Sequence, residues 1–233
     1  ETGFLRPKNA DGQFKANFIP DRWGTDYTEG SAWQNSYSAF HDIPGLMTAM
    51  GGADRFDAQL TALCNTKPSY HVGGYQMVIH EMAEMAAVDY GQLALSNQPS
   101  FHLPYLFSLA GHPEKTQVTV KQLRKLFSAA PAGYPGDEDN GSMAGWFIFA
   151  CLGFYPVCPA NAEYVRGIPA FDHVTLHLAD HDLELTTTNN HDHNNFVTSL
   201  TVDDQPFNAA VISHATLMAS HHLTTRLGLV PAN

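Results

Sequence analysis

Cysteine, basic residues and long apolar runs are all scarce in this sequence, and each shortage excludes a class of protein. The cysteines, Cys64, Cys151 and Cys158, are odd in number and lack Cys-x-x-Cys spacing, so they indicate neither a disulfide framework nor a zinc site. Lys and Arg number 12 against 23 Asp and Glu, and the resulting net charge of -11 argues against nucleic acid or an anionic membrane as partner. The longest apolar stretch, 143–154, falls short of the roughly 20 residues that span a bilayer, so we expect no membrane-spanning segment.

What the chain does contain is enough apolar material for a folded core. Of its 233 residues, 44% are hydrophobic and 11% are aromatic, which is ample for one soluble globular unit or slightly more. The acidic balance suits a neutral substrate or a cation. Because the chain starts at Glu1 with neither a Met nor a signal sequence, we expect an internal fragment or a processed product.

Apolar residues recur at helical spacing through most of the first 160 residues, and the period changes after that. Spacing of i, i+3 and i+4 predicts helices, with Gly, Pro or Asn between them, at 30–40, 43–50, 53–64, 75–89, 102–110, 117–130 and 142–153. Alternation then predicts antiparallel strands with one solvated face at 174–178, 183–186, 197–202 and 223–227. The sequence therefore predicts a mainly helical α+β chain, with a helical domain at 1–160 and a small antiparallel β domain at 161–233.

Three carboxylates stand between two glycines, Gly136 and Gly141, directly before an apolar helical segment. Asp137, Glu138 and Asp139 repel one another, and a structure tolerates that repulsion when a cation, a sugar or a proton transfer uses the charges. The alternative is a helix N-cap with first-turn acids that the helix dipole favours. Because a cap needs one Asp and not a run of acids, the pattern favours a functional site.

A second acidic group lies on the helix predicted at 75–89. Glu81 and Glu84 fall on one helical face after His80, a geometry that can hold a hard cation or bind sugar hydroxyls. A solvated acidic face is the alternative. The apolar residues around these acids favour partial burial of the carboxylates, and hence a role in binding a cation or a sugar. The motif is not that of the zinc peptidases, because Glu84 stands where a second His is needed.

Amide and aromatic side chains supply further candidates. Asn97 and Gln98 offer neutral oxygen ligands for calcium or hydrogen bonds to a sugar, although such residues are also common in turns. Trp33 could stack on a sugar face, whereas Trp146 on its apolar run belongs to the core. The His-rich segment 191–195 is flanked by Asn residues, which favours a hairpin loop over a metal site.

Five short blocks of the sequence carry a specific resemblance. They are 27–34 (YTEGSAWQ), 79–85 (IHEMAEM), 96–102 (SNQPSFH), 133–139 (GYPGDED) and 153–157 (GFYPV). In this order and spacing they resemble the calcium-dependent exo-α-mannosidases of glycoside hydrolase family 92, from about Gly3 to about Val174. The resemblance implies an (α/α)6 barrel preceded by a β-sandwich, and removal of terminal α-mannose with inversion of configuration.

This resemblance also implies catalytic roles. Cleavage of a glycosidic bond needs one carboxyl that protonates the leaving oxygen and one carboxylate that activates water or attacks directly. The resemblance makes Glu29 the general acid and Asp139 the base, assisted by Asp137, whereas the residues alone do not choose among the three clustered acids. The aromatic neighbours Tyr27 and Trp33 would keep Glu29 protonated by partial burial, and a capping-box Glu is the alternative.

The remaining site residues and partners are expected on the same basis. The expected sugar contacts are His80, Glu81, Trp33 and Gln34. The expected calcium ligands are Glu81, Glu84, Gln98 and Asn97. The implied substrate is a mannose-containing oligosaccharide or glycoprotein glycan, and the implied location is the periplasm or the outside of the cell.

The number of predicted helices limits this expectation. They are too few to close a barrel of twelve helices, so we expect the C-terminal half of the (α/α)6 barrel without the N-terminal β-sandwich and the first helices. The expected function is inverting, calcium-dependent hydrolysis of terminal α-mannose. The alternative is a non-catalytic carbohydrate-binding or structural fragment that needs the missing N-terminal half. The sequence leaves the linkage and the aglycone open.

Overall fold

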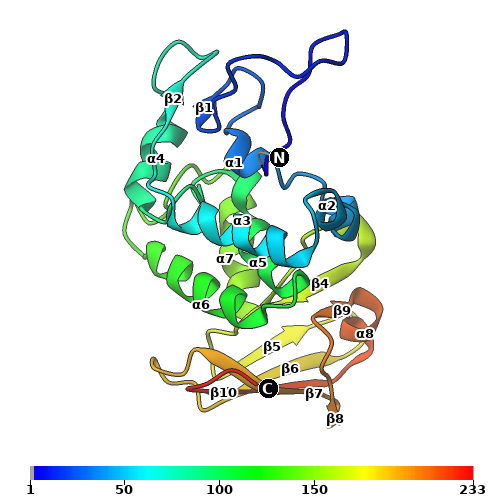
Figure 1. Cartoon of the computed structure of the whole chain (residues 1–233). Coiled ribbons are helices and arrows are strands. Elements are labelled where there is room, and N and C mark those ends of the chain that lie inside the picture. The colour runs from blue at the N-terminus through cyan, green and yellow to red at the C-terminus, as the bar shows by residue number, and fades with distance from the viewer. Residues whose placement is uncertain (1–2, 233) are drawn as a thin grey trace. The chain divides into compact units, whose positions relative to one another are not determined.

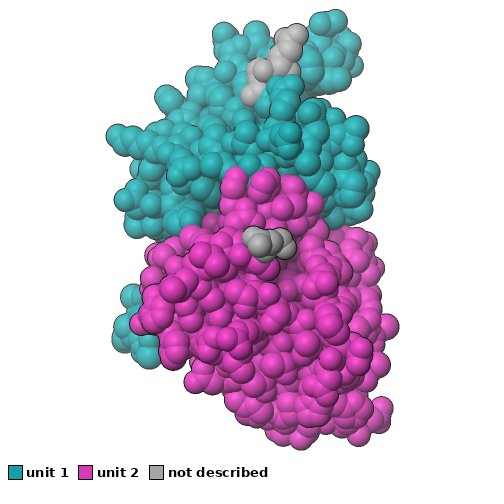
Figure 2. All heavy atoms as spheres, turned by 60° about the horizontal axis from the view of Figure 1, so that its bottom comes forward, with its two compact units in different colours: residues 1–103, 128–143 teal, residues 104–127, 144–233 magenta. Residues whose placement is uncertain are grey.

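A computed structural model describes residues 3–232 as short helices followed mainly by strands (Figure 1). The residues form two compact units, unit 1 with 1–103 and 128–143 and unit 2 with 104–127 and 144–233 (Figure 2). The predicted mixture of helices and strands is thereby confirmed. The division of the chain into domains at about residue 160 stays a prediction.

Unit 1 contains short helices and a two-stranded parallel sheet. Its elements are β1 (Arg22–Trp23), α1 (Ala32–Asn35), η1 (Phe40–Asp42), α2 (Ile43–Ala49), α3 (Ala53–Asn65), β2 (His71–Val72), α4 (His80–Val88) and η2 (Gln98–Ser100). The pairing of β1 with β2 brings the segment before α1 beside the segment before α4. Trp23 of β1 and Met82 and Met85 of α4 are buried in one apolar cluster that holds these segments together.

Two helices of unit 1 are shorter than the apolar pattern predicts. The helix predicted at 30–40 is only α1, whose first turn is closed by a capping box between Ser31 and Gln34. The helix predicted at 75–89 begins at His80 as α4, because Gln76 has a φ of 58° and a right-handed helix excludes that value. In both segments the apolar periodicity extends over residues that lie outside the helix.

His102 is a fully buried titratable side chain in unit 1. Its Nε2 lies 3.0 Å from the carbonyl oxygen of Tyr37, and its ring packs edge-on against Phe40. Because a carbonyl oxygen only accepts, Nε2 carries the proton of the neutral ring. Burial lowers the pKa of His102 from 6.5 to about 4, opposed only in part by the hydrogen bond to Tyr37.

We expect acid to destabilise the fold through His102. Between pH 6.5 and about pH 4 the unfolded chain binds a proton at this residue and the folded chain does not. The contribution to stability is therefore complete above pH 6.5 and is lost as the pH falls, by about 2 kcal/mol between pH 7 and pH 5. Urea unfolding at both pH values measures this difference. His102→Gln, which keeps an amide donor for Tyr37, should remove it, and the exposed control His41→Gln should not. An equal loss in the wild type and His102→Gln would contradict the assignment.

Unit 2 packs helices and two sheets. Helices α5 (Leu103–Leu109) and α7 (Ser142–Leu152) begin at the ends of unit 1 and continue into unit 2. The other elements are α6 (Pro113–Leu123), η3 (Arg124–Leu126), β3 (Phe154–Tyr155), η4 (Pro159–Asn161), β4 (Glu163–Arg166), β5 (His173–His177), β6 (Asp182–Thr188), β7 (Phe196–Val202), β8 (Gln205–Pro206), β9 (Val211–Ser213), α8 (His214–Ala219) and β10 (His222–Gly228).

The larger sheet has the strand order β5-β6-β10-β7-β8, and the smaller sheet has the order β3-β4-β9. β10 pairs antiparallel with β7 but parallel with β6, where Leu223 lies opposite Leu185. The prediction of an antiparallel β domain is therefore wrong at this pair, since side chains alternate with the same period in parallel and antiparallel strands. Because β10 lies between β6 and β7, the segment 191–195 is a loop but not a hairpin turn. Lys121 of α6 donates to three of its carbonyl oxygens.

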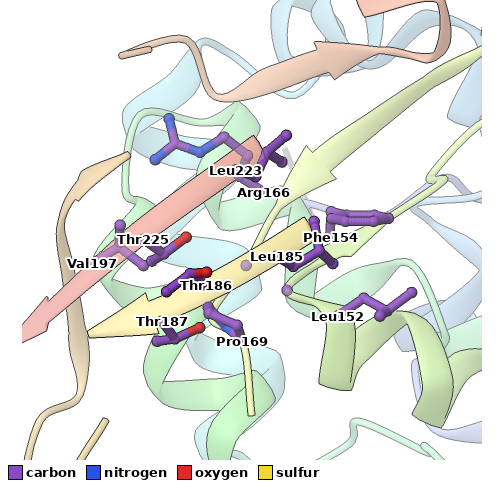
Figure 3. A pocket seen from close by; sticks show the side chains of 12 residues that line it. Leu152, Phe154, Arg166, Pro169, Leu185, Thr186, Thr187, Val197, Leu223 and Thr225 are labelled. Atoms are coloured by element: carbon purple, nitrogen blue, oxygen red, sulfur yellow. The ribbon is translucent and has the colours of Figure 1, made fainter. Parts of the chain in front are cut away.

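The interior of unit 2 contains an apolar core and a small cavity beside it. A core of apolar residues from the strands and from α8 includes Leu183, Leu200 and Leu217. A cavity of about 30 Å³ is lined by residues of the strands, among them Phe154, Thr187 and Leu223 (Figure 3). A volume of this size holds about one water molecule. In the described part of the chain, none of the helices is both long and apolar enough to cross a membrane.

Candidate active site

All residues that the sequence predicts for catalysis, sugar binding or cation binding lie in unit 1. They come from the loop before α1, from α1 itself, from helix α4, from the start of η2 and from the loop before α7. The structure gathers one group from Glu29, Asp139, Asn97 and Gln98. It gathers another from His80, Glu81, Glu84 and Asp137. Asp137 and Asp139, two residues apart in sequence, therefore have different surroundings.

Glu29 sits on an unusual backbone that is held from both sides. Its φ of 48° lies in the left-handed region, which non-glycine residues seldom adopt. Its N–H donates to the hydroxyl oxygen of Tyr75 at 3.0 Å, and its carbonyl oxygen accepts from Nδ2 of Asn97 at 2.9 Å. Such a conformation costs about 1–3 kcal/mol and persists where the surroundings impose it, commonly at active sites.

The surroundings of the Glu29 side chain differ from the expectation. Glu29 is exposed, so the partial burial predicted from Tyr27 and Trp33 is not found. The ring of Trp33 contacts Phe4 edge-on at 4.8 Å between centroids, and the hydroxyl of Tyr27 donates to the carbonyl of Leu5 at 2.5 Å. Burial is the main cause that raises the pKa of Tyr27 to about 12. Both aromatic side chains thus contact the N-terminal segment.

Tyr75 is a site residue that the sequence analysis missed. The parallel pairing of β1 and β2 brings it against Gly24, where a Cβ would lie 2.2 Å from the Tyr75 ring. Gly24 also has a φ of 68°, so both its backbone and its neighbour require glycine. The resulting contact fixes the hydroxyl that binds the Glu29 backbone. No motif marks Tyr75, because its role depends on two segments that meet only in the fold.

A polar hollow of about 560 Å³ lies beside Glu29. Its lining includes Thr28, which precedes Glu29, and Tyr75, which binds the Glu29 backbone. Lys15 and Asp26 also line it and form an ion pair. A hollow of this size with a polar lining has room for a sugar residue.

Asp139 is held by η2 in a similar way to Glu29. Its φ is 54°, again in the left-handed region, and its Oδ2 accepts from Nε2 of Gln98 at 2.7 Å. Earlier in the same loop, a Cβ on Gly136 would lie 2.2 Å from the carbonyl oxygen of Ser96, so only glycine permits the approach. The loop that carries Asp139 is therefore docked on the segment that precedes η2.

The three clustered acids, which sequence reasoning from the residues could not separate, have distinct environments. Oε2 of Glu138 accepts the N–H of Gly141 at 2.7 Å and so closes the turn before α7. The Asp137 side chain is 69% exposed and lies 3.9 Å from Nε2 of His80. Asp139 is half-buried and bound by Gln98. Asp139 is thus the acid of the three that η2 binds, through the side-chain amide of Gln98.

His80, Glu84 and Asp137 each offer a ligand atom, and these atoms lie within 4.8 Å of one another. Nδ1 of His80 is 3.0 Å from Oε1 of Glu84, and Nε2 of His80 is 3.4 Å from Oε1 of Glu81. The hydrogen bond to Glu84 is the main cause that raises the pKa of His80, and burial raises the pKa of Glu84. The first turns of α4 therefore concentrate carboxylates around one imidazole.

This group fits a hard cation. Among the described residues, the Oε2 atoms of Glu81 and Glu84 are buried and have no hydrogen-bond partner. A buried carboxylate oxygen without a donor is unfavourable, and a cation or a sugar hydroxyl would satisfy both atoms. Carboxylate oxygens are the ligands that calcium prefers. The residues present are therefore compatible with the predicted calcium site, with Asp137 as an additional oxygen donor.

Gln34, predicted as a sugar contact, is buried with 1% of its surface exposed. Its Oε1 accepts from the N–H of Ser31 at 2.8 Å, and its Nε2 donates to the carbonyl oxygen of Gln92 at 2.6 Å. In this structure Gln34 holds the segment that carries Glu29 and has no free face for a ligand.

Comparison with known proteins gives consistent matches. The family model for the glycosyl hydrolase family 92 catalytic domain matches residues 1–229. Among curated proteins, an uncharacterized secreted glycosidase of Arthroderma benhamiae is 24% identical over 149 residues, which are 64% of this chain and 16% of that protein.

Solved structures extend the comparison to the fold. A family 92 inverting mannosidase from Bacteroides thetaiotaomicron is 37% identical with a TM-score of 0.84, over 98% of this chain and 31% of that one. A family 92 α-mannosidase from the same bacterium is 24% identical with a TM-score of 0.86, over 99% of this chain and 29% of that one. The second match shows a shared fold alone. The chain thus spans less than a third of the length of these relatives.

Proposed function

Because this chain belongs to the glycosyl hydrolase family 92 catalytic domains, we propose that it supplies the acid and the base of an exo-acting α-mannosidase. The reaction is hydrolysis of terminal α-linked mannose by an inverting, calcium-dependent single displacement. The observation that carries the proposal is that Glu29 and Asp139, both on left-handed backbone, are bound by the adjacent residues Asn97 and Gln98. The 37% identical inverting mannosidase supports the reaction class.

Glu29 is the proposed general acid. Its proton goes to the glycosidic oxygen as the bond between that oxygen and the anomeric carbon breaks. The exposed position of Glu29 lets it meet a substrate, and the polar hollow lined by Thr28 and Tyr75 has room for the leaving sugar. The held backbone limits the motion of the acid, which favours proton transfer along one direction.

Asp139 is the proposed general base. It takes one proton from a water molecule whose oxygen forms the new bond to the anomeric carbon on the face opposite the leaving group. Gln98 occupies Oδ2, which leaves Oδ1 to face that water. An inverting pair needs room for the water, so we propose a separation of roughly 6.5–9.5 Å between the two carboxyl groups when sugar is bound. The resemblance also makes Asp137 an assistant of the base, and its Oδ2 lies 3.9 Å from Nε2 of His80.

Calcium is the proposed metal, with Glu81, Glu84 and Asp137 as its oxygen ligands. When bound, the cation supplies an electrophilic contact for mannose hydroxyls and favours a distorted ring. His80, exposed at the edge of this group, is the proposed neighbouring sugar contact. Asn97 and Gln98, which the sequence also predicts as ligands, direct their amide nitrogens to Glu29 and Asp139.

A panel of α-mannobioses tests the proposal. We expect release of mannose from at least one linkage by an active form of the enzyme that contains this chain. Binding of mannobiose by this chain without turnover, restored by adding the rest of the catalytic region, would instead support the non-catalytic alternative. That alternative has its own basis, because the chain covers only 31% of the inverting mannosidase.

The proposed substrate is a mannose-containing oligosaccharide or glycoprotein glycan, and the proposed location is the periplasm or the outside of the cell. The relative from Arthroderma benhamiae, a secreted glycosidase, supports the location. Immunodetection in culture medium and periplasmic extract, compared with the cytoplasm, tests it. Accumulation in the cytoplasm would contradict it.

A further inference from the structure

Two adjacent residues, Asn97 and Gln98, contact the two proposed catalytic residues separately. Nδ2 of Asn97 donates to the carbonyl oxygen of Glu29 at 2.9 Å, and Nε2 of Gln98 donates to Oδ2 of Asp139 at 2.7 Å. Consecutive Cα atoms are about 3.8 Å apart, so the two contacts start from nearly the same point in the fold. The segments that carry Glu29 and Asp139 are far apart in sequence, and both are bound by this one dipeptide.

The orientation of both amides is fixed by their partners. A carbonyl oxygen and a carboxylate oxygen only accept, so each amide must present its nitrogen. The amide oxygen of Asn97 is also engaged, because it accepts the N–H of Gln98 at 3.0 Å and caps η2. Neither side chain can turn over without losing a bond to Glu29 or Asp139.

The dipeptide itself is rigid. Asn97 is 3% exposed, and Pro99 follows it within the first turn of η2. The N–H of Asn97 donates to the carbonyl of Ala94 at 3.0 Å, and its own carbonyl accepts from Ser100 at 3.1 Å. Backbone hydrogen bonds on both sides thus hold the point from which the two amides project.

We propose that Asn97 and Gln98 are positioning residues that set the acid and the base of the reaction independently. Asn97 acts through the backbone of Glu29, and Gln98 acts through the carboxylate of Asp139. Gln98 selects which oxygen of Asp139 faces the attacking water. Asn97 selects the direction from which Glu29 reaches the leaving oxygen. This inference rests on the proposed function, since it assigns a use to contacts around those two carboxylates.

Each residue has a variant that removes the amide donor. Gln98→Met keeps the length of the side chain and loses the bond to Asp139. Asn97→Ser keeps a good helix-capping group and loses the bond to Glu29. Gln122→Met is the matched control, because Gln122 is an exposed residue of α6 in unit 2.

The test compares kcat and KM of each variant, in an active form of the enzyme, on α-mannobiose and on an aryl α-mannoside with an activated leaving group. Both substrates need a base, but only mannobiose needs proton donation to its leaving oxygen. We expect Gln98→Met to lower kcat about 10–100-fold on both substrates. We expect Asn97→Ser to lower kcat by a similar factor on mannobiose and less than about 3-fold on the aryl mannoside, with KM nearly unchanged in both variants. Gln122→Met should match the wild type.

Calcium titration and thermal unfolding complete the experiment. Unchanged calcium affinity in both variants supports the positioning role if Gln98→Met loses activity on both substrates and Asn97→Ser loses it mainly on mannobiose. A loss of calcium affinity would make these residues ligands and overturn the proposal. Equal losses of Asn97→Ser on both substrates, or a fall in thermal stability that accounts for the losses of both variants, would overturn it as well. A wild-type enzyme that hydrolyses no mannoside overturns the proposed function and this inference with it. An active wild type whose variants behave alike overturns this inference alone.

Discussion

Glu29→Gln should lower kcat/KM on α-mannobiose by about 10²–10⁴-fold and leave turnover of an aryl mannoside with an activated leaving group much less affected. The amide cannot donate a proton to the glycosidic oxygen, and only the natural substrate depends on that donation. Because the Glu29 side chain is exposed and its backbone supplies the bonds to Tyr75 and Asn97, the substitution should leave the local fold intact.

The matched control for this prediction is Glu163→Gln, at the start of β4 in unit 2. Glu163→Gln removes one carboxylate in the same way, and it should leave turnover of both α-mannobiose and the aryl mannoside unchanged. Equal losses of Glu29→Gln on the two substrates would remove Glu29 from the role of acid. An unchanged rate on mannobiose would contradict the site as a whole.

Removal of calcium should abolish turnover of mannobiose, and added calcium should restore it while zinc should not. Carboxylate oxygens such as those of Glu81 and Glu84 suit a hard cation with several oxygen ligands, whereas zinc favours four-coordinate sites with nitrogen or sulfur ligands. Within residues 3–232, the buried Oε2 atoms of both residues have no hydrogen-bond partner, and a bound cation would supply one.

Calorimetric titration of calcium into three variants tests which carboxylates bind the cation. Glu81→Gln and Glu84→Gln should each weaken calcium binding, because each removes a negative charge from the group near His80. Asp54→Asn, on the exposed side of α3, is the control and should bind calcium like the wild type. Full activity in the presence of a chelator would take calcium out of the mechanism.

Helices and strands were predictable wherever local pattern decides the structure. The helix predicted at 142–153 is α7 almost residue for residue, because apolar residues fill nearly every position of it. Pattern failed where backbone conformation decides. Gln76, with positive φ, delays the start of α4 until His80. The parallel pairing of β10 with β6 could not be predicted either, since side chains alternate in the same way in parallel and antiparallel strands.

The candidate site shows the same division. A run of acids before a helix could be recognised from the sequence, and the resemblance singled out Asp139 for the base. The residues alone could not separate it from Glu138, because the difference lies in partners, Gln98 for one and Gly141 for the other. No sequence pattern predicts a role for Tyr75, since its contact with Glu29 exists only once β1 and β2 pair.

The anomer of the first mannose released from α-mannobiose is the most direct test of the central claim, that Glu29 and Asp139 form an inverting pair. Proton NMR of an active enzyme distinguishes the two anomers before they interconvert. The account predicts β-mannose first, because water attacks the face opposite the leaving group. α-Mannose as the first product would mean that a carboxylate attacks the sugar directly, and it would contradict the roles assigned here to Glu29 and Asp139.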